Sequence, residues 1–358
     1  MRIAQITPRY FPHIGGIETH VKEISERLAR HHDVEVICAD LSPSLNRTEI
    51  VNGVNITRFR SFTWRNTLYL SPKMYTYLKK NRYDIIHAHN YHALPALLAS
   101  CAHPDNFVFT PHYHGKGSTL PTNLLLKPYY HLGSRIFSRA KKIICVSEYE
   151  KDLVITDFHL SPDTLSVIPN GVDLRAIRNA QPFDTPKNLI LSIGRLDKYK
   201  HLDLTTRAMG YLPDFHFYII GKSGNYKREL TDLIGSLSLG ERQKILDAVT
   251  DEEKYRWLKT CTLFVNLSDT EAFGITVLEA LAAKKSIIVN NTGGLQELAG
   301  KFKDIVAINP DEISDQNAPR ELAEIIKCRS GLLFTYDVTA YDWDSITEKT
   351  EQEYQKIV

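Results

Sequence analysis

Short apolar runs alternate along the chain with stretches in which apolar residues recur at helical spacing. After the run Arg2–Thr7, one helical face is formed by Ile17, Val21, Ile24 and Leu28. Continuous apolar runs are typical of strands that are buried on both faces of a parallel sheet. The predicted strands are 2–7, 34–39, 84–88, 107–110, 142–147, 166–169, 188–193, 215–221, 244–249, 263–267 and 286–290. Strand–helix alternation of this kind indicates an α/β chain with doubly wound sheets.

The alternation is interrupted once, in a segment that contains Asn170-Gly171, Pro182 and Pro186 and has the composition of a linker. A length of 358 residues also favours two domains. We therefore predict Rossmann-like domains over residues 1–168 and 188–340, joined by a linker over 169–187 and facing each other across a cleft. Ligands of such sheets bind beyond the carboxyl ends of the strands. Residues 341–358 are predicted to form a polar C-terminal helix.

Composition is that of a soluble globular protein, with 43% hydrophobic and 24% charged residues. We find no apolar run of about 18 residues, which a membrane-spanning helix needs, and the N-terminal apolar stretch is too short for a signal peptide. The five cysteines are dispersed and form no Cys-x-x-Cys motif, which favours reduced thiols in a cytoplasmic protein and disfavours a zinc site.

Two motifs in the first half follow predicted strands. Gly15 and Gly16 precede the first helix, where a backbone without side chains lets a phosphate approach the helix amides. His112 follows strand 107–110, and His87, His89 and His92 lie in a similar setting at and just after the end of strand 84–88. An imidazole at a strand end can hydrogen-bond a hydroxyl or a developing charge, but it can equally satisfy a loop carbonyl. Zinc is disfavoured as their ligand because no carboxylate follows at helical spacing.

Two motifs in the second half carry charge. Arg195 and Lys200 share the loop after strand 188–193, where two cations would neutralise a diphosphate. A solvated basic loop is the alternative. Glu271 and Glu279 flank the start of a predicted helix over 275–283, and both can accept hydrogen bonds from paired hydroxyls. Glu279 lies in a strongly apolar stretch, so an ordinary surface role suits it less well.

Together these segments resemble the retaining glycosyltransferases of family 4, which have the GT-B fold, and the resemblance extends over essentially the whole chain. The motifs that carry it are Gly15-Gly16, Thr110-x-His112, Val146-Ser147-Glu148, Pro169-Asn170-Gly171-Val172-Asp173, Gly194-Arg195 with Lys200, and Glu271-x-Phe273-Gly274 followed by Glu279.

The resemblance implies a role for each matching residue. Glu279 would bind the donor ribose and Glu271 the transferred sugar, while Arg195 and Lys200 would bind the diphosphate. His112 would lie beside the reacting carbon. The remaining substrate-binding residues would be Gly15, Gly16, Asn170, Phe273, Gly274 and Ile275. The C-terminal helix would cross back to the first, acceptor-side domain, and the second domain would hold the nucleotide sugar.

The resemblance also implies the reaction: transfer of a hexose from a UDP- or GDP-sugar to a hydroxyl, with retention on one face of the sugar. Neither a metal ion nor another cofactor would be needed. Two departures from the family pattern concern the donor loops. His201 stands where a glycine commonly follows Lys200, and Gly221 and Gly224 replace a Gly-x-Gly pair.

Basic and aromatic residues are interleaved in the acceptor-side half, which suggests contact with an anionic membrane surface and a lipid-linked or glycan acceptor. The residues concerned are Arg58, Arg60, Trp64, Arg65, Tyr69, Lys73, Lys79, Lys80 and Arg82, followed by Lys116, Leu124–126, Lys127, Tyr129, Tyr130, Arg135, Arg139, Lys141 and Lys142. A sugar-nucleotide epimerase, another GT-B enzyme and an inactive sugar-nucleotide-binding module are the alternatives. Nucleic-acid binding has no supporting motif.

Overall fold

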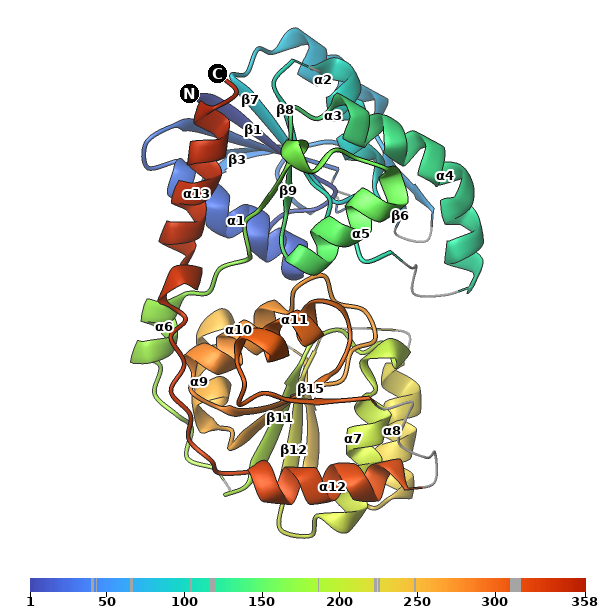
Figure 1. Cartoon of the computed structure of the whole chain (residues 1–358), viewed down its shortest axis with the longest axis vertical. Helices are drawn as coiled ribbons and strands as arrows, with labels where there is room; N and C mark the ends of the chain where they lie inside the picture. Colours follow the sequence, from blue (N-terminus) through green and yellow to red (C-terminus); the bar gives the residue numbers. More distant parts are fainter. Residues whose placement is uncertain are drawn as a thin grey trace. The chain divides into compact units, whose positions relative to one another are not determined.

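In the computed structural model the chain forms two compact units (Figure 1). The first comprises Met1–Gly171 together with Trp343–Val358, and the second comprises Val172–Asp342. The structure describes residues 1–358 except 40, 41, 43, 65, 66, 104, 116–119, 186, 222, 223, 225, 248 and 310–316. Among the helices of the described residues, none combines the length and apolar character needed to cross a bilayer.

The first unit is built on an eight-stranded sheet of order β10-β9-β8-β7-β1-β2-β4-β3. Its strands are β1 (Arg2–Thr7), β2 (Asp33–Cys38), β3 (Thr48–Val51), β4 (Val54–Arg58), β7 (Ile85–His89), β8 (Phe107–Thr110), β9 (Lys142–Cys145) and β10 (Leu165–Val167). All pairs are parallel except β3 with β4. The strand order reverses between β1 and β7, which is where ligands of doubly wound sheets bind.

The helices of the first unit cover this sheet and include the C-terminal helix. They are α1 (Gly16–Leu28), α2 (Pro72–Lys80), α3 (Leu94–Ala102), α4 (Leu120–Arg139), α5 (Glu148–Phe158) and α13 (Trp343–Gln355). Figure 1 shows α13 running beside α1, and the two helices are in contact. Trp343, Ile346 and Tyr354 of α13 are buried in the same apolar cluster as Val21 and Ile24 of α1. The last helix is therefore part of the core of the first unit.

The hairpin β3–β4 was not predicted, because its strands contain no long continuous apolar run. In β4, buried and partly buried residues alternate, as in a strand with one wetter face. Its turn is Asn52-Gly53, both with positive φ, which is a strong sequence signal for a tight hairpin. A second hairpin, β5 (Phe62–Trp64) with β6 (Thr67–Leu70), was missed for the same reason.

The second unit contains a six-stranded parallel sheet of order β13-β12-β11-β14-β15-β16. Its strands are β11 (Leu189–Ile193), β12 (His216–Ile220), β13 (Gln243–Leu246), β14 (Leu263–Asn266), β15 (Ser286–Asn290) and β16 (Val306–Ile308). This order is that of the dinucleotide-binding Rossmann fold, and it reverses between β11 and β14. The fold class predicted from the sequence, two Rossmann-like units with doubly wound sheets, is confirmed.

Helices flank this second sheet as well. They are α6 (Leu174–Asn179), α7 (Leu202–Ala208), α8 (Lys227–Ser236), α9 (Asp251–Thr260), α10 (Ile275–Ala282), α11 (Gly293–Lys301) and α12 (Ala318–Arg329). Helix α6 lies inside the segment 169–187, which the sequence predicted as a linker. Its start is fixed by Asp173, whose carboxylate accepts a hydrogen bond from the amide of Ala176 at 2.8 Å.

Candidate functional site

The charged residues predicted in the second unit lie on both sides of the point where its strand order reverses. Arg195 and Lys200 follow β11, and Glu271 follows β14. The carboxyl ends of these two strands form a small pocket whose lining includes Ser192, Arg195, Lys200 and Asn266. The sheet topology thus brings together residues that are more than seventy positions apart in the sequence.

Lys200 and Glu271 form an ion pair in which the ammonium donates to Glu271 Oε1. Their side chains are 13% and 23% exposed, so the pair is largely withdrawn from water. Burial by itself would lower the pKa of Lys200, but the adjacent Glu271 carboxylate raises it. Lys200 is therefore a fixed positive charge at this strand end.

Arg195 lies beside this pair and is the more accessible cation. Its side chain is 67% exposed, and its guanidinium donates from Nη2 to the Tyr199 hydroxyl at 2.9 Å. Asp197 lies 3.5 Å from its Nε atom. An exposed, forked donor next to a buried ammonium is an arrangement suited to a phosphate or diphosphate group.

The backbone of the loop after β11 explains the two departures from the family pattern. His201 has a φ of 49°, in the left-handed region where glycine is favoured, and its Nε2 lies 2.6 Å from Asp269 Oδ1. A Cβ atom at Gly221 would lie 2.2 Å from the Gly194 carbonyl oxygen, and one at Gly224 would lie 1.9 Å from that of Leu196. Both glycines are required by the close approach of this loop, and Lys222 and Ser223 lie outside the described residues.

Helix α10 begins at the other predicted motif. Gly274 precedes it with a φ of 98°, and Ile275 is its first residue. Phe273 is buried, with its ring 6.3 Å from that of Tyr341. The amide of Gly294, in α11, donates to the carbonyl oxygen of Glu271 at 2.9 Å. The first turns of α10 and α11 therefore hold the segment that carries Glu271.

Glu279 is 3% exposed and pairs with a residue that sequence reasoning missed. Lys254, in α9, donates from Nζ to Glu279 Oε1 at 2.7 Å, and its own side chain is 16% exposed. Burial would lower the pKa of Lys254, but the Glu279 carboxylate raises it. A sequence signal existed, because Lys254 lies four positions before Leu258, the buried residue of α9, and so shares its helix face.

In the first unit, Gly15 and Gly16 lie at the start of α1, after β1. A Cβ atom at Gly15 would lie 2.3 Å from Glu18 Oε2, and Glu18 pairs with Arg9 at 2.9 Å. Gly15 thus makes room for an ion pair at the helix N-terminus. A phosphate approaching these amides would meet both the carboxylate and the guanidinium.

His112 follows β8 and has a φ of 48°. The neighbouring backbone is held by the fully buried Glu150, which accepts hydrogen bonds from the amides of Tyr113 and Val146. Burial raises the pKa of Glu150 to about 8, although these two amides act in the opposite direction. Burial also holds the pKa of His112 well below its ordinary value, so the imidazole is neutral.

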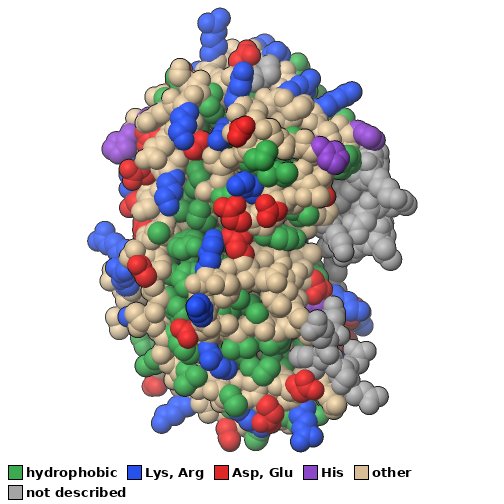
Figure 2. All heavy atoms as spheres, viewed as in Figure 1, with side chains coloured by type: hydrophobic (Ala, Val, Ile, Leu, Met, Phe, Trp, Pro, Cys, Tyr) green, Lys and Arg blue, Asp and Glu red, His purple; other side chains and the backbone are tan. Residues whose placement is uncertain are grey.

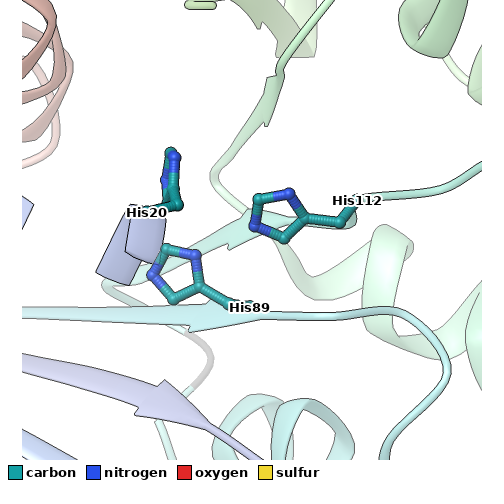
Figure 3. A group of neighbouring side chains, drawn as sticks. All are labelled: His20, His89 and His112. Atoms are coloured by element: carbon teal, nitrogen blue, oxygen red, sulfur yellow. The ribbon is translucent and has the colours of Figure 1, made fainter. Parts of the chain in front are cut away.

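The ring of His112 meets two further histidines, as Figure 3 shows. His20 comes from α1 and His89 from the end of β7, and their ring centroids lie 5.0 and 5.8 Å from that of His112. Asn170, a predicted substrate-binding residue, lies with its side-chain oxygen 2.6 Å from His20 Nδ1. Burial lowers the pKa of His20 to about 4 despite this hydrogen bond. Sequence reasoning did not single out His20.

A chain of buried hydrogen bonds continues from His89 to the C-terminal helix. His89 Nε2 lies 2.8 Å from Gln5 Oε1, and Gln5 Nε2 donates to the Tyr354 hydroxyl at 3.0 Å. The Tyr354 hydroxyl lies 2.6 Å from Nδ1 of His87, whose Nε2 lies 2.8 Å from the Thr110 hydroxyl. Of the predicted site residues, Arg195, Lys200 and Glu271 thus lie together in the second unit, and His112 and Asn170 lie around His20 in the first. Gly15 and Glu279 have separate contacts, with Glu18 and Lys254 respectively.

Two known families match this chain in adjoining segments. Residues 14–176 match Glycosyltransferase Family 4, and residues 173–331 match Glycosyl transferases group 1. The GPI3 subunit of phosphatidylinositol N-acetylglucosaminyltransferase from Saccharomyces cerevisiae is 25% identical over 99% of this chain and 83% of its own length. The GDP-mannose:cellobiosyl-diphosphopolyprenol alpha-mannosyltransferase of Komagataeibacter xylinus is 24% identical over 100% and 94%.

A solved structure of similar fold is sucrose-phosphate synthase from Thermosynechococcus elongatus. It superposes with a TM-score of 0.77 at 17% sequence identity and covers 100% of this chain and 99% of that one. At this identity the likeness establishes the fold.

The pair Lys254–Glu279 yields a prediction about stability. Replacing Glu279 by alanine removes the carboxylate from a largely buried ammonium and should lower the free energy of unfolding by about 3 kcal/mol. The double variant Lys254→Met with Glu279→Leu, which leaves neither a charge nor a polar group, should recover most of this loss. Urea unfolding measures the free energy of unfolding of each variant. Glu297→Ala, which breaks the more exposed pair with Lys301, is the control and should cost less than about 0.5 kcal/mol. Equal effects of Glu279→Ala and the control would contradict the prediction.

Proposed function

This chain is a glycosyltransferase whose residues 14–176 match Glycosyltransferase Family 4 and whose residues 173–331 match Glycosyl transferases group 1, and we propose that it transfers a hexose from a UDP- or GDP-sugar. That the protein is a glycosyltransferase with the GT-B fold follows from these matches and from its structural neighbours. The proposal adds the donor class, a hydroxyl acceptor on a lipid-linked or cell-surface glycan precursor, retention of configuration, and catalysis without a metal ion.

The observation that carries the proposal is the group Arg195, Lys200 and Glu271 at the strand-order reversal of the second unit. A donor diphosphate would take the place of the Glu271 carboxylate as the partner of Lys200, with Arg195 on its other oxygens. Glu271 would then be released to accept hydrogen bonds from the hexose hydroxyls. The two cations would also stabilise the charge that develops on the departing diphosphate.

Further donor contacts are proposed for α10. Its first amides, at Gly274 and Ile275, can bind a phosphate oxygen, while buried Phe273 supports this turn. Glu279 would accept hydrogen bonds from the ribose diol, and Lys254 would keep its carboxylate ionised and oriented. The ribose hydroxyls would thus meet a fixed negative charge.

For the first unit we propose roles in the same reaction. The neutral imidazole of His112 contacts the transferred sugar near the reacting carbon, and Gly15, Gly16 and Asn170 contribute to substrate binding. In the transfer step, the bond between the anomeric carbon and the diphosphate oxygen breaks. The acceptor oxygen bonds to the same carbon from the same face, and its proton passes to the departing phosphate. No nucleophile of the protein is required.

The donor proposal is tested with a panel of UDP-, GDP- and ADP-sugars. A UDP- or GDP-sugar should raise the melting temperature and be slowly hydrolysed with release of free nucleotide. Arg195→Ala should lose most of both effects, because it removes the accessible cation, whereas Lys327→Ala, at an exposed helical site, should keep them. An epimerase would instead return an altered sugar nucleotide, and an inactive module would release no nucleotide. Absence of stabilisation by every sugar nucleotide would overturn the proposal.

The two glutamates should separate donor binding from turnover. Glu271→Gln removes the partner of Lys200, so the affinity for the free nucleoside diphosphate should be kept or increased, while kcat should fall roughly 100-fold. Glu279→Gln should mainly raise KM for the donor. Isothermal titration with the diphosphate and steady-state kinetics measure the two effects. Parallel losses of donor affinity in both variants would contradict this division of roles.

The acceptor proposal is supported by the relatives' names, which specify phosphatidylinositol and a diphosphopolyprenol. It also draws on α2, which exposes Lys73, Lys79 and Lys80 and contains no acidic residue.

Two residues expected on this basic face are in fact buried. Arg58 is 3% exposed because it pairs with Glu49 and donates to backbone carbonyls, and Tyr69 is 5% exposed because it packs in the apolar core of the unit. Other residues expected on this face lie outside the part of the chain that the structure describes. They are Arg65, Lys116 and the side chains of Trp64 and of residues 124–129.

Charge is mixed elsewhere on this unit. On the face that Figure 2 shows, Lys and Arg alternate with Asp and Glu and form no continuous basic patch. Peripheral contact with the cytoplasmic face of a membrane is therefore proposed for α2 specifically.

Flotation with vesicles tests the contact. The wild-type chain should bind vesicles that contain an anionic phospholipid and not neutral ones, since each lysine near an anionic surface contributes about 1 kcal/mol. Replacing Lys73, Lys79 and Lys80 together by glutamine should weaken binding by about tenfold or more. Replacing the exposed Lys303, Lys327 and Lys349 removes equal charge and should have little effect. Equal binding to neutral and anionic vesicles would disprove the contact.

A further inference from the structure

Three buried imidazole nitrogens that lie close together in the first unit have no hydrogen-bond partner among the described residues. They are His20 Nε2, His89 Nδ1 and His112 Nε2. One ring nitrogen from each of these residues lies within 4.8 Å of those of the other two, and Figure 3 shows the three rings turned toward a common point. Burying a polar atom without a partner costs free energy. Three of them in one place indicate that something binds there.

The tautomer of His89 is set by its hydrogen bond with Gln5. Gln5 donates from its amide nitrogen to Tyr354, so its oxygen faces His89 Nε2 and can only accept. His89 must therefore carry its proton on Nε2, which leaves a lone pair on Nδ1. Nδ1 is the nitrogen of His89 that has no hydrogen-bond partner among the described residues.

The tautomer of His20 is set in the same way by Asn170. The amide oxygen of Asn170 lies 2.6 Å from His20 Nδ1, so this nitrogen donates and Nε2 keeps its lone pair. A side-chain oxygen that accepts from the outer nitrogen of an imidazole is the usual support of a metal-binding histidine. Two of the three rings have this support.

The neighbouring His87 provides a contrast. It is as deeply buried, and its ring lies 4.1 Å from that of His89, but both of its nitrogens have hydrogen-bond partners, Tyr354 and Thr110. Burial of a histidine in this unit is thus compatible with full hydrogen bonding. Burial alone therefore does not account for the open nitrogens of His20, His89 and His112; His92 Nε2 is also open, but it lies outside this cluster.

We infer that His20, His89 and His112 form a binding site for one divalent transition-metal ion, with Zn²⁺ as its simplest occupant. Imidazole favours zinc, cobalt, nickel and copper over magnesium or calcium, which prefer oxygen ligands. Three histidines with an open fourth position is a known zinc geometry. Zinc bound by three imidazoles places their nitrogens about 3.4 Å apart, so each ring has to move inward by about 0.8 Å at most.

Metal in this site would engage the nitrogen of His112 that a sugar would otherwise contact. Bound Zn²⁺ should therefore inhibit transfer rather than assist it. This consequence, unlike the site itself, rests on the proposed function.

Binding is tested on the full chain with Zn²⁺ alone, by elemental analysis after dialysis, and with Co²⁺, whose visible absorption reports tetrahedral nitrogen ligation. About one equivalent should bind. His20→Ala and His112→Asn should each lower the affinity at least tenfold, and Asn170→Ala, which frees the His20 tautomer, about tenfold. Asparagine tolerates the left-handed backbone at position 112, so this variant should keep the fold, as circular dichroism can verify. His31→Ala, at an exposed histidine, should bind normally.

Failure of the folded wild-type chain to retain metal, or unchanged affinity in His112→Asn, would overturn the site. Transfer assays separate the two proposals. Saturating Zn²⁺ should lower wild-type turnover at least tenfold and leave the residual turnover of His20→Ala unaffected. If zinc binds at one equivalent and turnover is unchanged, the site stands and the proposed contact of His112 with the sugar fails.

Discussion

Polar side chains at the carboxyl ends of buried parallel strands must find partners inside the protein, and both units are organised by this requirement. In the second unit the solution is ionic: Lys200 neutralises Glu271 beyond the ends of β11 and β14. A similar pair joins two neighbouring helices, where Lys254 of α9 neutralises Glu279 of α10. In the first unit it is a chain of neutral hydrogen bonds through Gln5, which leaves selected imidazole nitrogens open. The difference decides what each cluster can bind. Charges that are paired and exchangeable suit a diphosphate, whereas oriented lone pairs suit a cation or a hydroxyl.

Most of the fold can be predicted from the sequence. Every predicted strand is present, with its ends displaced by a few residues, because continuous apolar runs such as Leu189–Ile193 are an unambiguous signal of buried parallel strands. The hairpin β3–β4 was missed because its apolar residues alternate, although Asn52-Gly53 signalled its turn. Helix α6 was not predicted because Asn-Gly and the prolines give the whole segment 169–187 the composition of a linker.

The candidate site was predictable only in part. The motif residues could be recognised one by one, but their partners could not, because Lys254 and Glu279, or Gln5 and Tyr354, are brought together by tertiary packing alone. The three-histidine cluster shows this most clearly. The sequence disfavoured a zinc site because no carboxylate lies at helical spacing from the histidines, whereas the three histidines that lie together come from a helix, a strand end and a loop. Spacing along one helix is uninformative for ligands assembled in this way.

The bond between Gln5 and Tyr354 joins residues 349 positions apart, near opposite ends of the chain. Its consequence concerns biosynthesis. The ribosome completes the entire second unit before it makes α13, so the first unit is synthesised early but lacks part of its core until α13 has been made. During that interval Gln5 and His87 have no Tyr354 to bond, and the apolar face of α1 has no Trp343 against it. The unit made first is therefore the unit that can finish folding last, and it is the one most in need of protection from aggregation during translation.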